Sequence, residues 1–150
     1  MRAIVIPMLA VISSVAALAQ AQPRVMSAGT SADVTVRGTA SGDMPASDIM
    51  QGCQGYVPDQ PDFRFNHTQA PLRQFLRMYT QSDEDLVLVI RRPDGSYLCD
   101  DDSGPGLNPA IDDNDPQRGT YDVWVGVFRP ETIADYTLTL TSSRNPVDDQ

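Results

Sequence analysis

Two side chains in the sequence could act together as a nucleophile and its base. Ser103 lies in the stretch CDDDSGPGLNP, residues 99–109, and His67 is the chain's single histidine. A catalytic serine needs a base within hydrogen-bond reach and a carboxylate that orients this base. A serine hydrolase that uses Ser103 and His67 is therefore one hypothesis for the function.

The residues around Ser103 and His67 argue against this chemistry. Chymotrypsin-like proteases carry Gly-Asp-Ser-Gly-Gly-Pro at the nucleophile, whereas here Asp101 replaces the first Gly and Pro105 comes one position early. His67 lies in FNHTQ, which has nothing of the Ala-Ala-His-Cys context of that family's base. The chain is also far shorter than the double barrel of those enzymes.

The acidic side chains of the same region suggest a cation site instead. Calcium prefers six to eight hard oxygen ligands from flexible loops. The spacing does not match an EF-hand loop, and Asp and Asn side chains also cap turns by accepting bonds from backbone N–H groups. Calcium is thus a hypothesis, and turn formation is the alternative, for Asp100, Asp102, Asn108, Asp112, Asp113 and the nearby Asp115.

Composition and the first residues of the sequence point to export. Residues 3–19 are almost entirely apolar and end in Ala17-Leu18-Ala19, which is typical of a cleaved signal peptide over residues 1–21. The formal net charge is −9, which disfavours nucleic acid and anionic membranes as partners. We therefore expect a periplasmic or secreted protein without a membrane anchor after cleavage.

The two cysteines are expected to pair. Exported chains meet an oxidising environment, and an even number of cysteines favours a disulfide. A metal site would need more soft ligands than two cysteines and one histidine. The sequence therefore predicts a structural disulfide between Cys53 and Cys99.

Short alternating segments separated by Gly and Pro predict an all-β domain. Leu86–Ile90 is a continuous apolar run, as in a strand that is covered on both faces. The turn at residues 92–96 contains Pro93-Asp94-Gly95, which favours a hairpin. Residues 119–127 and 135–141 alternate, and residues 33–37 suggest an edge strand. The expected core contains Leu86, Leu88, Ile90, Val123, Val125, Leu138 and Leu140.

These segments predict one jelly-roll-like β-sandwich of about eight short antiparallel strands over residues 33–143. A flexible lead-in is expected at residues 22–32 and a disordered tail at residues 144–150. The pattern does not define residues 38–51. Trp124 and Tyr121 could stack on sugars, although aromatic residues on a central strand more often belong to the core.

The sequence resembles a known family over residues 53–141. The similar segments are GCQGYVPDQPDFRF, EDLVLVIRRPDGSYLCDDDSGPGLNPAI and GTYDVWVGVF. They resemble the pre-peptidase C-terminal domain, a secreted bacterial module. This resemblance implies a jelly-roll-like β-sandwich, usually appended to secreted proteases, that is itself non-catalytic and in some relatives binds calcium.

The sequence thus favours an exported, non-catalytic β-sandwich that serves as an accessory or binding protein for an envelope protein, an extracellular protein or a polysaccharide. The alternatives are a serine hydrolase and a carbohydrate-binding module. No cofactor is expected other than the calcium ion considered above.

Overall fold

The computed structural model describes residues 24–28, 33–68 and 75–143. The expected signal peptide, residues 1–21, and the expected tail, residues 144–150, lie outside the described residues. The described part is an all-β sandwich of two sheets with a single short 3-10 turn, η1 (Ala46–Asp48). The predicted fold class is confirmed, with eleven strands in place of about eight.

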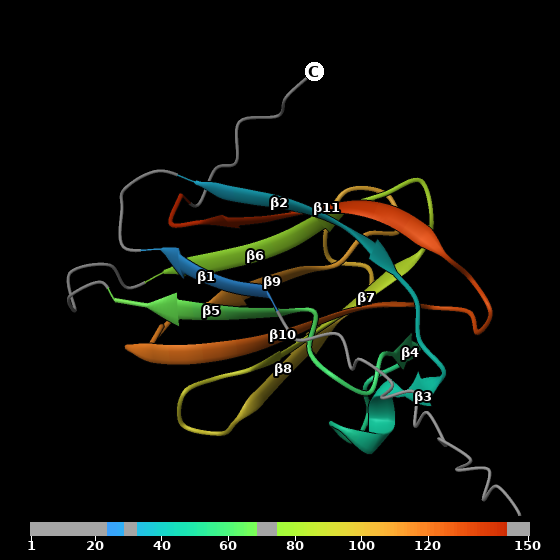
Figure 1. The fold of residues 1–150 in the computed structure, drawn as a ribbon, viewed down its shortest axis with the longest axis horizontal. Coiled ribbons are helices and arrows are strands. Elements are labelled where there is room, and N and C mark those ends of the chain that lie inside the picture. Colours follow the sequence, from blue (N-terminus) through green and yellow to red (C-terminus); the bar gives the residue numbers. More distant parts are fainter. Residues whose placement is uncertain (1–23, 29–32, 69–74, 144–150) are drawn as a thin grey trace, which may run out of the picture.

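The larger sheet has seven strands and the smaller sheet has four (Figure 1). The seven-stranded sheet contains β1 (Arg24–Ala28), β3 (Met44–Pro45), β4 (Tyr56–Val57), β5 (Phe63–His67), β7 (Leu86–Arg91), β8 (Tyr97–Asp100) and β10 (Gly119–Val127). The four-stranded sheet, in spatial order, contains β2 (Val34–Ala40), β11 (Ala134–Thr141), β6 (Leu76–Gln81) and β9 (Ala110–Asp113).

Most neighbouring strands are antiparallel, and β1 differs because it pairs with β5 in parallel. In Figure 1 the strands β2, β11 and β6 form the upper layer, and β5, β10 and β8 form the lower layer. The segment expected as a flexible lead-in, residues 22–32, therefore contains a strand at residues 24–28, whose backbone completes one edge of the larger sheet.

The main core fills the space between the two sheets. It includes all seven residues that the alternation predicts, each at most 3% exposed. On β10 the residues from Tyr121 to Val127 that face this core alternate with residues that face the other side, as the sequence predicts. On β11 Thr139 and Thr141 face outward as expected, yet both are buried.

A second apolar cluster lies on the outer face of the seven-stranded sheet. Val87 and Val89 of β7 and Trp124 of β10 face away from the main core, because successive residues of a strand point to opposite faces of its sheet. Residues 44–57 fold over this outer face and cover it with further apolar side chains, from Met44, Ala46, Ile49, Met50, Cys53 and Val57. Residues 44–51 of this cover belong to the stretch, residues 38–51, that the sequence pattern does not define.

Glycines permit the close approach of this cover to the sheet. A Cβ atom at Gly126 would lie 2.1 Å from the carbonyl oxygen of Tyr56, so only glycine lets β4 pair with β10 here. Gly55 has a φ of +80°, and a Cβ atom at this position would lie 2.4 Å from a methyl carbon of Val87. Both glycines thus serve backbone packing.

The disulfide between Cys53 and Cys99 joins the cover to β8, which confirms the predicted pairing. The two Cα atoms are 5.9 Å apart and the bond spans a sequence separation of 46 residues. The cross-link therefore ties the cover to the strand that pairs with β7.

We expect that the denatured, unreduced protein contains no free thiol. Reduction should lower the melting temperature, because closing a loop of this length stabilises a fold by about 4 kcal/mol in the chain-entropy model. Thiol titration in denaturant and thermal unfolding with and without reductant measure both effects. Two titratable thiols in the unreduced protein would contradict the bond.

We expect Leu88→Ala to lower the free energy of unfolding by about 2–5 kcal/mol, because Leu88 is fully buried and its truncation leaves a cavity. Urea denaturation measures this loss. Asn66→Ala, an exposed change on β5, is the control and should alter stability by less than about 0.5 kcal/mol. Equal effects of the two changes would show that Leu88 is not a core residue.

Candidate functional site

The loop after β8 is organised by the carboxylate of Asp100. Its Oδ2 accepts hydrogen bonds from the backbone N–H groups of Ser103, at 2.9 Å, and Ala110, at 2.8 Å. Its Oδ1 accepts a hydrogen bond from the hydroxyl of Ser103 at 2.6 Å. Ser103 is therefore a turn residue whose hydroxyl is already donated to a neighbouring carboxylate.

The structure does not bring Ser103 and His67 together. His67, at the end of β5, pairs with Gly119 at the start of β10. Asp100 pairs with Leu88, and Leu88 in turn pairs with Val125 near the other end of β10. Along β10, Gly119 and Val125 are six residues apart, which corresponds to roughly 20 Å. Because Ser103 is bonded to Asp100, the predicted nucleophile and base lie near opposite ends of one sheet.

His67 is a buried side chain among aromatic rings. It is 7% exposed, and its ring centroid lies 5.8 Å from that of Phe65 and 6.3 Å from that of Tyr121. Burial lowers the pKa of His67, and Arg118 lowers it further, against the opposing effect of Asp113. His67 is thus held as a neutral ring in the wall of the core.

Apart from the nearby Asp115, the sequence suggests five calcium ligands, and four of these five have other partners. Asp112 pairs with Arg77 on β6, at 2.6 and 3.0 Å, and Asp113 pairs with Arg92, at 2.9 and 3.0 Å. The side-chain amide of Asn108 donates to the carbonyl oxygens of Ser82 and Pro105, and Asp100 binds the turn described above. Only Asp102 forms no hydrogen bond among the described residues.

The described ranges contain no group of three or more His, Cys, Asp or Glu side chains arranged to hold a metal ion. Asp112 and Asp113 belong to β9, where consecutive residues face opposite sides of the sheet. The charge of Asp102 acts on Asp85. Burial, together with the charges of Asp102 and Asp101, raises the pKa of the Asp85 carboxyl. The five side chains are therefore not gathered around one point.

Asp113 instead belongs to a buried polar network at one end of the core. It accepts hydrogen bonds from Arg92 and, at 3.2 Å, from the hydroxyl of Tyr121. The same hydroxyl accepts a bond from the backbone N–H of Gln117 at 2.8 Å. Burial raises the pKa of Tyr121 to about 12, and the charge of Asp113 adds to this effect.

The two aromatic residues considered for sugar stacking lie on opposite faces of β10. Tyr121 is fully buried in the main core, and Trp124 is 8% exposed in the outer cluster beneath the cover. They do not form a shared platform, and the expectation that they are core residues is confirmed.

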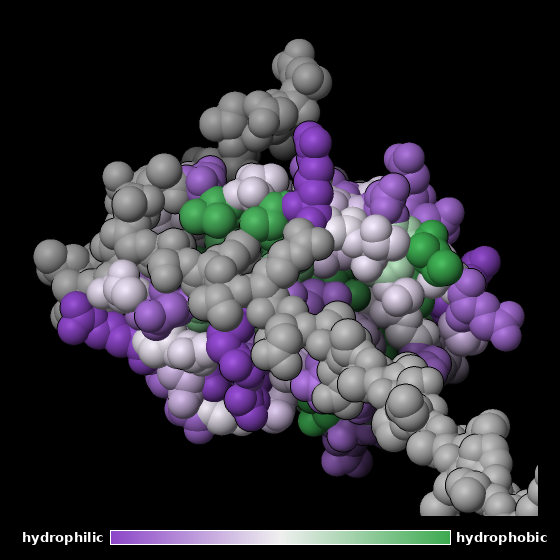
Figure 2. All heavy atoms as spheres, viewed as in Figure 1, coloured by the Kyte–Doolittle hydropathy of each residue, from purple (hydrophilic) through white to green (hydrophobic). Residues whose placement is uncertain are grey.

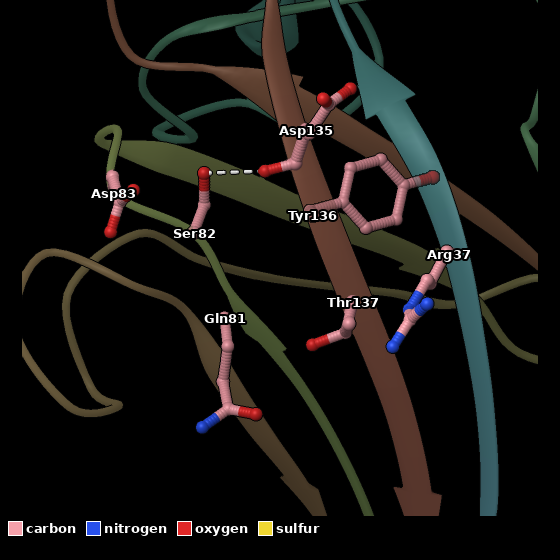
Figure 3. Close-up of a pocket in the computed structure, with 7 residues that line it drawn as sticks. All are labelled: Arg37, Gln81, Ser82, Asp83, Asp135, Tyr136 and Thr137. Atoms are coloured by element: carbon pink, nitrogen blue, oxygen red, sulfur yellow. Dashed lines mark hydrogen bonds between the residues drawn. The ribbon is translucent and has the colours of Figure 1, made fainter.

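A polar groove lies on the outer face of the four-stranded sheet (Figure 3). Its floor is one row of directly opposed residues, because Thr137 of the central strand β11 pairs with Arg37 of β2 and with Gln81 of β6. The groove has a volume of about 480 Å³ and is lined by Arg37, Gln81, Ser82, Asp83, Asp135, Tyr136 and Thr137.

Hydrogen bonds fix one end of this groove. The hydroxyl of Ser82 donates to the carbonyl oxygen of Asp135 at 2.8 Å, and the hydroxyl of Thr39 donates to the carboxylate of Asp135 at 2.9 Å. Beyond Thr137, the hydroxyls of Thr35 and Thr139 lie 3.0 Å apart, and Tyr79 pairs with Thr139. The groove thus presents hydroxyl, amide, carboxylate and guanidinium groups on a rigid sheet.

Such a set of side chains offers hydrogen-bond donors and acceptors to a hydroxyl-rich or amide-rich ligand. Sequence reasoning did not find this groove, because its residues come from strands that are far apart in the chain. The only sequence signal is the outward alternation of polar residues in the strands around residues 35–39 and 135–141.

The visible surface is mainly hydrophilic, with small and separate apolar patches (Figure 2). In the described part of the chain the exposed large apolar side chains are Leu107 and Ile133. No helix among the described residues is long and apolar enough to span a membrane.

Fold and groove together define the class as an all-β sandwich with a groove of polar side chains on one outer face. No family model and no curated protein matches the chain. Solved structures with a similar fold include the pre-peptidase C-terminal domain of a collagenase from Bacillus anthracis. It has a TM-score of 0.48 and 11% sequence identity, over 80% of this chain and 95% of that chain.

A second similar structure is PliG from Aeromonas hydrophila, described as a periplasmic inhibitor of g-type lysozyme. Its TM-score is 0.42 with 11% identity, over 80% of this chain and 98% of that chain. The structural comparison thus includes the family that the sequence resembles, which agrees with the predicted resemblance. At this level of identity the likeness concerns the fold alone.

We expect acid to destabilise the protein through His67. Its pKa in the folded state lies below the ordinary value of 6.5, so the unfolded chain binds the proton more readily as the pH falls through this value. The free energy of unfolding should therefore fall for the native chain relative to His67→Gln, which has no proton to bind, between about pH 8 and about pH 5. Urea denaturation across this range measures the difference, and parallel curves for both proteins would contradict the lowered pKa.

Proposed function

We propose that this chain is an exported, non-catalytic β-sandwich that acts as an accessory or binding protein in the periplasm or the extracellular space. The observation that carries the proposal is the state of the residues that could do chemistry. Ser103 donates its hydroxyl to Asp100, and His67 packs among aromatic rings near the opposite end of the sheet. Both residues serve the fold.

The disulfide supports export. Structural disulfides persist in oxidising compartments and are rare where thiols are kept reduced. The Cys53–Cys99 bond fixes a cover that the outer apolar cluster needs, so the bond serves stability rather than redox chemistry. The apolar segment at residues 3–19, expected to be a signal peptide, agrees with this location.

The groove favours a polysaccharide as the ligand. Sugars are bound by planar polar side chains that donate and accept hydrogen bonds, and the row of Arg37, Thr137 and Gln81 supplies such groups on a rigid strand surface. Tyr79 lies beyond this row and is only partly buried, so its ring is available for contact with a sugar face. The carbohydrate site that we propose therefore differs from one built on Trp124 and Tyr121.

The proposal is tested by two measurements on the same protein. Incubation with a fluorophosphonate probe, followed by intact-mass measurement, should give no adduct, because the Ser103 hydroxyl bonds the Asp100 carboxylate and His67 lies near the opposite end of the sheet. A covalent adduct on Ser103 would make the protein a hydrolase and overturn the proposal.

Affinity electrophoresis through gels that contain soluble polysaccharides tests the groove. Retardation by at least one neutral polysaccharide is expected, and the double variant R37A/Q81A should migrate freely because it loses both sides of the row. The matched control R129A/Q60A changes the same residue types outside the groove and should still be retarded. If R37A/Q81A is still retarded, the polysaccharide binds outside the groove. If no polysaccharide retards the native protein, polysaccharides are excluded as the ligand.

A further inference from the structure

A row of charged and aromatic side chains crosses the outer face of the seven-stranded sheet, on the opposite side of the sandwich from the groove. Strand register sets four residues directly opposite one another across β5, β10, β7 and β8: Arg64, Asp122, Arg91 and Tyr97. They share the outer face with Val89, Cys99 and Trp124, which lie one row further along under the cover.

Asp122 holds the two arginines on either side of one carboxylate. Arg64 Nε lies 2.7 Å from Oδ1 and Arg91 Nη2 lies 2.5 Å from Oδ2. The Asp122 side chain is 4% exposed, whereas the arginine side chains are 45% and 47% exposed. The carboxylate is therefore buried beneath two guanidinium groups that reach solvent.

This arrangement leaves a surplus positive charge. One arginine is sufficient to balance a buried carboxylate, so the second leaves the cluster with a net charge of +1 on a chain whose formal net charge is −9. Each arginine bonds Asp122 through one nitrogen, and neither guanidinium forms a further hydrogen bond within the described part of the chain. Several N–H donors therefore face solvent from both sides of Asp122.

Other ion pairs of the fold differ in this respect. Arg92 binds Asp113 through two nitrogens and also donates to the carbonyl oxygen of Asp115, so its donors are largely used. Arg77 binds Asp112 through two nitrogens in a one-to-one pair. In each of these pairs a single arginine balances a single carboxylate.

We propose that the Arg64–Asp122–Arg91 cluster binds one carboxylate or sulfate group carried on a sugar ring. Guanidinium groups recognise planar or tetrahedral oxyanions through paired charge-assisted hydrogen bonds. An anion placed over Asp122 contacts both arginines at once, while the buried carboxylate keeps their planes fixed. This site does not depend on the proposed groove.

The neighbours of the cluster suit a sugar. Tyr97 lies next to Arg91 and is partly exposed, and its ring centroid is 6.4 Å from that of Trp124, so it offers an aromatic surface beside the cations. Asn66 and Thr120 form the next row, both exposed, and supply an amide and a hydroxyl for ring hydroxyls. The acidic remainder of the surface disfavours a dense polyanion and favours a sparsely charged ligand.

The test follows the arginine Nε–H signals in nuclear magnetic resonance spectra during titration with glucuronate, glucose 6-sulfate and glucose. Glucuronate or the sulfate should shift the signals of Arg64 and Arg91 in a saturable way, and the anion that shifts them identifies the oxyanion. Glucose, which has the same ring without the charge, should not shift them. Arg77 is the internal control, because it is paired with a carboxylate on the other sheet and should not respond.

Single variants complete the test. Arg91→Gln and Arg64→Gln each leave one arginine on Asp122, so both should keep the fold, which an unchanged near-ultraviolet circular dichroism spectrum checks. Each should weaken the binding of the anion by roughly tenfold, the loss of one charge-assisted contact. The proposal is wrong if glucose shifts the signals as the anions do, if Arg77 responds equally, if neither anion produces a shift, or if both folded variants bind as the native chain does.

Discussion

The constraint on which the structure depends is that β7 from Leu86 to Ile90, and β10 from Val123 to Val127, carry no charged or polar side chain on either face. Both faces of such a strand must be covered by other parts of the protein, since an uncovered face would expose apolar side chains to water. The smaller sheet covers one face of the pair through the main core. The other face is covered by residues 44–57, and the glycines and the disulfide of this region follow from that need.

The same constraint sets where binding chemistry is available. Among the described residues, the cover packs on the outer face of the larger sheet around Val87, Val89 and Trp124, and it does not extend to the row of Arg64, Asp122 and Arg91. There the side chains become charged, and Asp122 is buried with its two arginines. On the smaller sheet the outer face around the groove is built mainly from threonine, glutamine, arginine and aspartate, so it needs no apolar cover there. The two outer faces therefore differ in chemistry for a structural reason.

Much of the fold was predictable because its signals are local. The apolar run at residues 86–90, the hairpin turn after it and the alternation of residues 119–127 and 135–141 gave the central strands and their inward faces, and the cysteine count gave the disulfide. The cover was not predictable, because its small residues show no periodicity. Their role becomes clear only from the close packing of the cover on β7 and β10. The sequence suggests Asp112 and Asp113 as loop residues that bind calcium or form turns, whereas in the structure they lie on β9 and pair with arginines. The groove and the arginine cluster depend on cross-strand register, which no single segment of the sequence contains.

The position of β11 has a consequence for the order in which the chain can fold. This strand is the most C-terminal in the described part of the chain, yet it lies between β2 and β6 and pairs with both. During synthesis the smaller sheet has no centre until residues 134–141 have been made, and the main core has only one of its two walls. The incomplete chain therefore cannot close its sandwich before residues 134–141 are available.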